Sequence, residues 1–117
     1  MKDLADRVAI VTGSSSGVGA ATARLLASEG CHVLINYNSN EEGANAVAGD
    51  CEAHGVETLV LRGNVAEDSD CIAMATAAID KWGRIDVLVN NAGTTKFLDH
   101  ANLDGLDKDD FQHIYGV

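Results

Sequence analysis

Short apolar runs alternate with longer amphipathic segments along most of this chain of 117 residues. Each run is too short to form a helix and has the composition of a strand that is buried on both faces of a sheet. Strands that alternate with helices in this way predict βαβ units and a parallel sheet. The predicted strands are residues 8–11, 33–35, 58–61 and 85–89.

The three segments between these strands have the period of amphipathic helices. Two of them are predicted as helices over residues 20–29 and 68–82, and Trp82 closes an apolar stripe that is expected to face the core. The helix between them is expected to begin at a capping box formed by Ser39 and Glu42, which have the spacing of that motif. A glycine follows each segment, where the C-terminal cap of a helix belongs.

The predicted order of elements leaves few possible folds. Connections between parallel strands are right-handed in nearly all proteins, which removes most topologies. The simplest remaining arrangement is an α/β fold with a doubly wound parallel sheet, in which the strand order is 3-2-1-4. No linker, low-complexity segment or second domain is apparent, so we expect residues 1–117 to be part of one domain.

Charge and composition exclude several classes of function. Eight Lys and Arg residues against eighteen Asp and Glu residues give a net charge of −10, which opposes binding to nucleic acid or to an anionic membrane surface. No apolar run approaches the roughly 18 residues that a membrane-spanning helix needs. Three cysteines, an odd number without a signal peptide, favour a reducing cytoplasmic location.

The cysteines and histidines lack the spacing of metal ligands. No Cys-x-x-Cys pair occurs, so the cysteines are predicted to be small buried hydrophobic residues. The histidines lie far apart in the sequence, and we predict no metal site. The residues concerned are Cys31, Cys51, Cys71, His32, His54, His100 and His113.

A glycine-rich turn joins the first predicted strand to the first predicted helix and reads TGSSSGVG over residues 12–19. Gly13 allows a tight exit from the strand, Gly17 leaves space for a phosphate, and Gly19 lets the helix pack closely. The free N–H groups at the start of the helix favour an anion there, and the three serines can add hydroxyl donors. Because these donors are mainly backbone dipoles, an acidic protein can still bind a diphosphate.

The spacing of this turn separates it from two common phosphate-binding motifs. Its pattern is G-x-x-x-G-x-G and not G-x-G-x-x-G, and no lysine follows the last glycine as in a P-loop. A glycine-rich turn that binds no ligand is the alternative interpretation. The strand before it and the helix after it favour a dinucleotide site.

This turn, together with the sequence NNAG over residues 90–93, resembles the short-chain dehydrogenase/reductase family. The resemblance implies a Rossmann-like fold, a bound nicotinamide dinucleotide, and hydride transfer between that cofactor and a small alcohol or carbonyl substrate. It also implies a homo-oligomer. The resemblance runs along the whole chain but covers only about the first half of a family member, since single-domain α/β enzymes of this kind have roughly 250 residues.

The resemblance also implies which residues bind the cofactor. Asn64 and Val65 stand where the family usually has Asp-Val beside the adenine, and the amide of Asn64 can both donate to and accept from the base. Thr12 and Asn90 are expected instead to tie the two central strands together. The implied cofactor-binding residues are Gly13, Ser15, Ser16, Gly17, Val18, Gly19, Tyr37, Asn38, Asn64, Val65, Asn91, Ala92 and Gly93.

The end of the second strand bears on the choice between NAD(H) and NADP(H). Enzymes that use NAD usually have an acidic residue there, which binds the ribose 2′-hydroxyl. Here Tyr37 stands between two asparagines, so no carboxylate repels a 2′-phosphate, and we expect NADP(H) to be favoured over NAD(H). The basic residue that NADP-preferring members often carry is absent from Ser16 and Asn38, which leaves NAD(H) open. Residues 36–39 resemble those of 3-oxoacyl-carrier-protein reductase-like members, which mostly use NADPH.

No catalytic residue can be assigned. The family uses a tyrosine as acid/base and a lysine four residues later, which lowers the tyrosine pKa. Tyr37 has Glu41 at that spacing, and Tyr115 is followed by too few residues. We therefore expect 1–117 to be the N-terminal, cofactor-binding part of a single Rossmann domain, inactive without its catalytic half. The alternative is a catalytically empty nucleotide-binding or interaction module that ends at residue 117.

Overall fold

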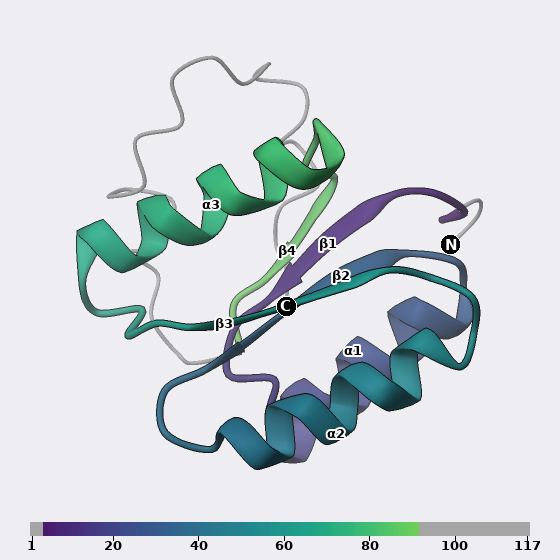
Figure 1. The fold of residues 1–117 in the computed structure, drawn as a ribbon, viewed down its shortest axis with the longest axis horizontal. Helices are drawn as coiled ribbons and strands as arrows, with labels where there is room; N and C mark the ends of the chain where they lie inside the picture. Colours follow the sequence, from purple (N-terminus) through teal and green to yellow (C-terminus); the bar gives the residue numbers. More distant parts are fainter. Residues whose placement is uncertain (1–3, 92–117) are drawn as a thin grey trace.

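A four-stranded parallel sheet lies between two helical layers in the computed structural model, which describes residues 4–91 (Figure 1). The strands are β1 (Val8–Val11), β2 (His32–Tyr37), β3 (Thr58–Arg62) and β4 (Val87–Val89). Their order is β3-β2-β1-β4, and every neighbouring pair is parallel. The predicted α/β fold and its strand order 3-2-1-4 are therefore confirmed.

Helices α1 and α2 cover one face of the sheet, and α3 covers the other (Figure 1). Their bounds are α1 (Gly17–Ser28), α2 (Glu41–Glu52) and α3 (Asp68–Trp82). The bounds of α3 agree with the prediction, because Gly83 adopts a left-handed φ of 78° directly after the last turn. Helix α1 begins before the predicted residue 20, since the glycines of the turn already form its first turn.

The start of α2 differs from the predicted capping box. The N-cap is Asn40, whose side-chain oxygen accepts a hydrogen bond of 3.0 Å from the backbone N–H of Gly43. The prediction of a Ser39–Glu42 pair was wrong by one residue. Asparagine and serine are about equally good N-caps, so local preference alone does not choose between the two neighbours.

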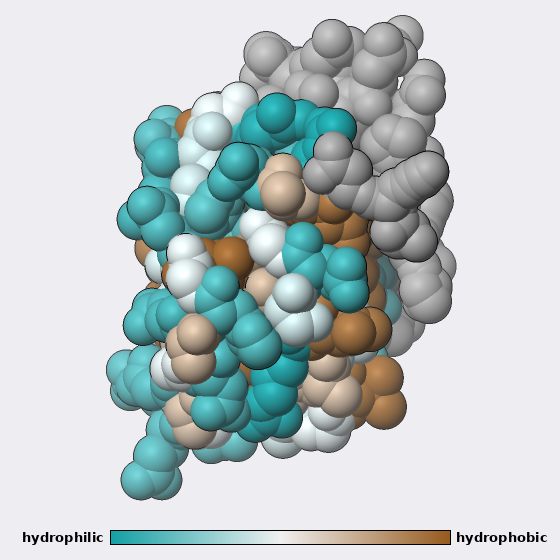
Figure 2. Space-filling view, turned by 90° about the vertical axis from the view of Figure 1, so that its right-hand side faces the viewer, coloured by the Kyte–Doolittle hydropathy of each residue, from teal (hydrophilic) through white to brown (hydrophobic). Residues whose placement is uncertain are grey.

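The sheet divides the core into two clusters. Ala9, Val11 and Val33 point toward α1 and α2, whereas Ile10 and Leu34 point toward α3, because side chains alternate between the two faces of a strand. The helical members of the first cluster include the predicted stripe of α2, which is buried: Ala44, Val47, Ala48 and Cys51. Seen from the side on which the strands begin, hydrophilic residues gather on the left of the described surface and hydrophobic residues toward its right (Figure 2).

Trp82 is only partly buried, which differs from the predicted core position. Its indole N–H donates a hydrogen bond of 3.0 Å to Glu57, and its ring stacks on that of His32 with centroids 5.9 Å apart. The last turn of α3 thus lies at the edge of the core, where an indole can pack with one face and keep its polar edge in contact with water.

The carboxyl group of Asp86 fixes the start of β1 beside β4. It accepts hydrogen bonds from the Val8 N–H at 2.9 Å and from Arg84 Nε at 2.8 Å, and Arg7 lies 3.5 Å away. Burial by itself would raise the pKa of Asp86. The hydrogen bonds from Arg84 and Val8, with the charges of Arg84 and Arg7, outweigh burial and hold that pKa below its ordinary value.

Replacing Asp86 with asparagine is expected to lower the free energy of unfolding at neutral pH by about 1–3 kcal/mol. Because the folded-state pKa is lowered, the carboxylate stabilises the fold fully above its unfolded-state pKa, and this contribution disappears as the pH falls through the folded-state value. The difference between wild type and Asp86→Asn should therefore shrink in acid. Urea denaturation from neutral to strongly acidic pH measures it.

The matched control is Asp50→Asn, since Asp50 forms an exposed ion pair with Arg24 at 2.9 Å. An exposed pair contributes little, so this variant should follow wild type at every pH. Parallel stability curves for wild type and Asp86→Asn would contradict the role assigned to Asp86.

Candidate functional site

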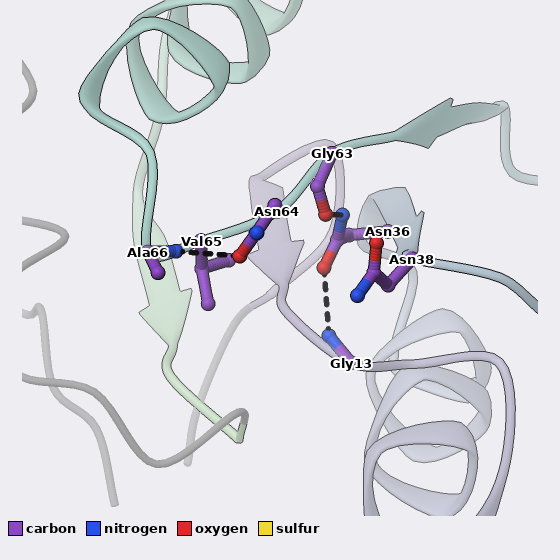
Figure 3. Close-up of a pocket in the computed structure, with 7 residues that line it drawn as sticks. All are labelled: Gly13, Asn36, Asn38, Gly63, Asn64, Val65 and Ala66. Carbon is purple, nitrogen blue, oxygen red and sulfur yellow. Dashed lines mark hydrogen bonds between the residues drawn. The ribbon is translucent and has the colours of Figure 1, made fainter.

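A hollow of about 320 Å³ opens where β1, β2 and β3 end (Figure 3). Ligands of open α/β sheets bind at the carboxyl ends of the strands, so this is the expected place for a site. Its lining residues are Gly13, Asn36, Asn38, Gly63, Asn64, Val65 and Ala66. Four of the predicted cofactor-binding residues are among them, and none of the seven is acidic.

The turn after β1 has the backbone geometry of a tight exit into a helix. Gly13 and Gly17 have φ values of 60° and 61°, in the left-handed region that favours glycine. Among residues 4–91, a Cβ placed on Gly17 would meet no atom within 4 Å, so the backbone there faces space that these residues leave open. Val18 beside it is 72% exposed.

The amino end of α1 offers backbone donors to an anion. Its N-cap, Ser16, forms no capping hydrogen bond with its side chain, and no acidic residue lies in the first turn. The first N–H groups of a helix have no partner within it and carry the positive end of the helix dipole. With the open space over Gly17, this end of α1 can bind a phosphate group through backbone N–H groups.

Gly19 marks the closest approach between α1 and the turn. A Cβ at this position would lie 2.7 Å from Nδ2 of Asn91 and 2.9 Å from the carbonyl carbon of Gly13. The sequence predicted that Gly19 lets the helix pack closely. The structure shows that its near neighbours belong to the turn and to Asn91, which follows β4.

The three serines of the turn do not have equivalent positions. Ser14 is fully buried, donates a hydrogen bond of 2.7 Å to the Val11 carbonyl and accepts one of 2.9 Å from the Asn36 N–H. Its predicted role as a donor to the diphosphate was wrong, because its hydroxyl already joins β1 to β2. Ser16 is exposed and Ser15 half-buried, so these two can still contribute hydroxyl groups.

Asn36 holds the ends of three strands together, and the sequence interpretation missed this role. Its side-chain oxygen accepts from the Gly13 N–H at 2.9 Å, and its amide nitrogen donates to the Gly63 carbonyl at 3.0 Å (Figure 3). The residue is only 2% exposed. A polar residue at the end of an otherwise apolar strand was the available signal.

Asn64 presents a hydrogen-bond donor to the hollow. Its side-chain oxygen accepts from the Ala66 N–H at 2.9 Å (Figure 3). Its own backbone N–H donates to the carboxylate of Asp70 at 2.8 Å. The sequence suggested that this amide could both donate to and accept from an adenine. The oxygen already accepts one hydrogen bond from Ala66, whereas the two amide N–H donors are available to a ligand.

The two central strands are tied as predicted. The Thr12 hydroxyl lies 3.2 Å from Oδ1 of Asn90 and donates to it, and the Thr12 N–H donates to the Val89 carbonyl at 3.0 Å. Asn91 donates from Nδ2 to the Gly13 carbonyl at 3.3 Å, which joins the end of β4 to the glycine turn. The predicted positions Ala92, Gly93 and Tyr115 lie outside the described residues.

Tyr37 does not line the hollow. It ends β2, is half-buried and packs against the cluster under α1 and α2. Its partner in register is Arg62 at the end of β3. The Nε of Arg62 donates a hydrogen bond of 3.2 Å to the carbonyl of Asn38. A basic residue therefore lies beside the end of β2, where the sequence alone showed none.

The cysteines are buried, as predicted. Burial raises the pKa of Cys31 and of Cys51 to about 11 and also raises that of Cys71, so the thiols are poor nucleophiles. Over residues 4–91, no group of three or more His, Cys, Asp or Glu side chains is arranged to hold a metal ion. None of the helices described has the length and apolar character needed to cross a membrane.

Comparisons with known proteins agree with this arrangement. An uncharacterised oxidoreductase of Methylorubrum extorquens is 36% identical over the whole chain, which covers 46% of that protein. A 3-oxoacyl-[acyl-carrier-protein] reductase of Synechocystis is 43% identical over 82% of the chain and 39% of its own length. The chain thus spans less than half the length of these relatives.

This chain is also similar to a solved structure and matches a family model. A protein described as a dehydrogenase from Burkholderia cenocepacia, with bound NADP, superposes with a TM-score of 0.72 and 28% identity. That alignment covers 75% of this chain and 34% of the other. The sequence model of the short-chain dehydrogenase family matches residues 7–117. The chain belongs to the short-chain dehydrogenase family of oxidoreductases.

Proposed function

We propose that this chain is the cofactor-binding part of an oxidoreductase that transfers hydride between a nicotinamide dinucleotide and a small alcohol or carbonyl substrate. The observation that carries the proposal is the open backbone at Gly17, at the amino end of α1, in the same glycine turn whose Gly13 lines the hollow where β1, β2 and β3 end. This combination suits a diphosphate with an adenosine beside it. The names of the relatives support the reaction class.

Each part of the site has a distinct task in the proposal. The N–H groups at the amino end of α1 would bind the diphosphate, with the hydroxyls of Ser15 and Ser16. Asn64 would donate to the adenine ring, whereas Asn91, Ala92 and Gly93 would border the ribose nearest the nicotinamide. The bound nicotinamide supplies or accepts the hydride. The tyrosine and lysine that move the proton in this family would lie outside residues 1–117.

NADP(H) is proposed as the preferred cofactor. None of the described residues that line the hollow carries a carboxylate, so none of them repels a 2′-phosphate. The related structure from Burkholderia cenocepacia holds NADP, which supports the same preference. The buried free thiols also suit a reducing compartment, and we propose a cytoplasmic enzyme that forms homo-oligomers.

Titration of the protein expressed from its full gene with NADPH and NADH, followed by cofactor fluorescence, tests this function. Both should bind, NADPH more tightly, and ketone reduction with NADPH should be detected. Binding without hydride transfer to any alcohol or ketone of a broad panel would favour a catalytically empty nucleotide-binding module. The absence of binding to either cofactor would refute the proposal.

A further inference from the structure

Arg62 differs from the other basic residues that the structure describes. Arg7, Arg24, Lys81 and Arg84 each lie within 3.8 Å of a carboxylate oxygen. Arg62 has no carboxylate partner within residues 4–91, and its one hydrogen bond within that range goes to a backbone carbonyl. In a chain with a net charge of −10, an exposed guanidinium without an anion beside it is a candidate for binding one.

The position of Arg62 relates it to the hollow. It is the last residue of β3, and the parallel register pairs it with Tyr37 at the end of β2. Its Nε donates to the carbonyl of Asn38, and both Asn38 and the next residue, Gly63, line the hollow. Arg62 therefore brings positive charge to the end of β2, where dinucleotide enzymes distinguish a 2′-hydroxyl from a 2′-phosphate.

The chemistry of the guanidinium fits a phosphate. The hydrogen bond from Nε to Asn38 holds the group against the strand end and leaves the two terminal nitrogens as donors. A planar pair of N–H donors matches the oxygens of a phosphate monoester, and the charge strengthens each bond. None of the seven described residues that line the hollow is acidic, so none of them competes with a phosphate for these donors.

We propose that Arg62 is the specificity-determining residue that binds the 2′-phosphate of the adenine ribose. The inference rests on the proposed dinucleotide site but goes further, because it assigns the preference for NADP(H) to one side chain on β3. Arginine reaches this position through the pairing of β3 with β2 and not through the loop that follows β2.

Dissociation constants of NADPH and NADH for wild type, Arg62→Gln and Arg62→Lys test the assignment, with 2′,5′-ADP and 5′-AMP as smaller probes. We expect Arg62→Gln to raise the dissociation constants of NADPH and 2′,5′-ADP about tenfold to a hundredfold. The dissociation constants of NADH and 5′-AMP should change less than about twofold. The affinity of Arg62→Lys for NADPH should lie between those of wild type and Arg62→Gln, because lysine keeps the charge but lacks the planar pair of donors. Raising the salt concentration should reduce the wild-type preference for NADPH.

Arg24→Gln is the matched control, since it removes an exposed arginine of α1 that pairs with Asp50. Arg24→Gln should leave the dissociation constants of NADPH and NADH unchanged. This result would show that an effect of Arg62→Gln comes from a local contact and not from the loss of one positive charge. Unchanged NADPH binding in Arg62→Gln, or equal weakening of NADPH and NADH, would overturn the inference and leave the proposed function standing. Failure of wild type to bind either dinucleotide would overturn both.

Discussion

Alanine at position 19 is expected to lower the affinity for nicotinamide dinucleotide by about ten- to a hundredfold and the free energy of unfolding by about 1–3 kcal/mol. Its Cβ would lie 2.9 Å from the carbonyl carbon of Gly13, a backbone atom that cannot rotate away. The turn must then shift away from α1. That shift moves the backbone donors that are proposed to bind the diphosphate. Dinucleotide titration and urea denaturation of Gly19→Ala measure the two effects.

Gly49→Ala is the control for this substitution. Gly49 lies inside α2, and a Cβ there would meet no atom of the described part of the chain within 4 Å. Alanine favours a helix interior over glycine by about 0.5–1 kcal/mol, so this variant should be more stable and bind as wild type does. If Gly19→Ala instead behaved like Gly49→Ala, the close approach at Gly19 would have no functional consequence.

Elements whose signals are local were predicted well. Each strand contains a short apolar run, although β2 extends beyond the predicted residues 33–35 and β4 is shorter than the predicted 85–89. Helix α3 is bounded by acidic residues in its first turn and by Gly83 after its last. The start of α2 was missed because Ser39 and Asn40 are both good caps. Tertiary packing separates them: with Asn40 as the cap, Gly43 lies against the glycine turn, where a Cβ would be 2.5 Å from the Ser15 carbonyl oxygen.

Contacts that depend on strand register could not be predicted from the sequence. The predicted strand order places β3 beside β2, but it does not say which residues pair. Only the observed register brings Arg62 beside Tyr37. Ser14 is likewise held by Asn36, which lies 22 residues later on β2: the Ser14 N–H donates to the Asn36 carbonyl, and the Asn36 N–H donates to the Ser14 hydroxyl. The glycine turn could be identified from its motif, whereas the side chains that support it could not.

Replacing Asn36 with alanine is expected to lower the free energy of unfolding by about 2–5 kcal/mol. The change removes a side chain that is only 2% exposed and leaves the Gly13 N–H and the Gly63 carbonyl without their partner. Each unsatisfied buried group costs about 1–3 kcal/mol. Since Gly13 and Gly63 line the hollow from two strand ends, dinucleotide affinity should fall as well. Urea denaturation and NADPH titration provide the two measurements.

Asn36→Asp separates the two hydrogen bonds. The introduced carboxylate can still accept from the Gly13 N–H but cannot donate to the Gly63 carbonyl, and burial beside that oxygen raises its pKa. This variant should therefore gain stability relative to wild type as the pH falls and the carboxyl becomes a donor, whereas Asn36→Ala should not.

Asn38→Ala is the control, because this side chain is exposed at the same strand end. Its free energy of unfolding should stay within about 0.5 kcal/mol of wild type. Equal stability of Asn36→Ala and Asn38→Ala would show that the buried amide does not support the site.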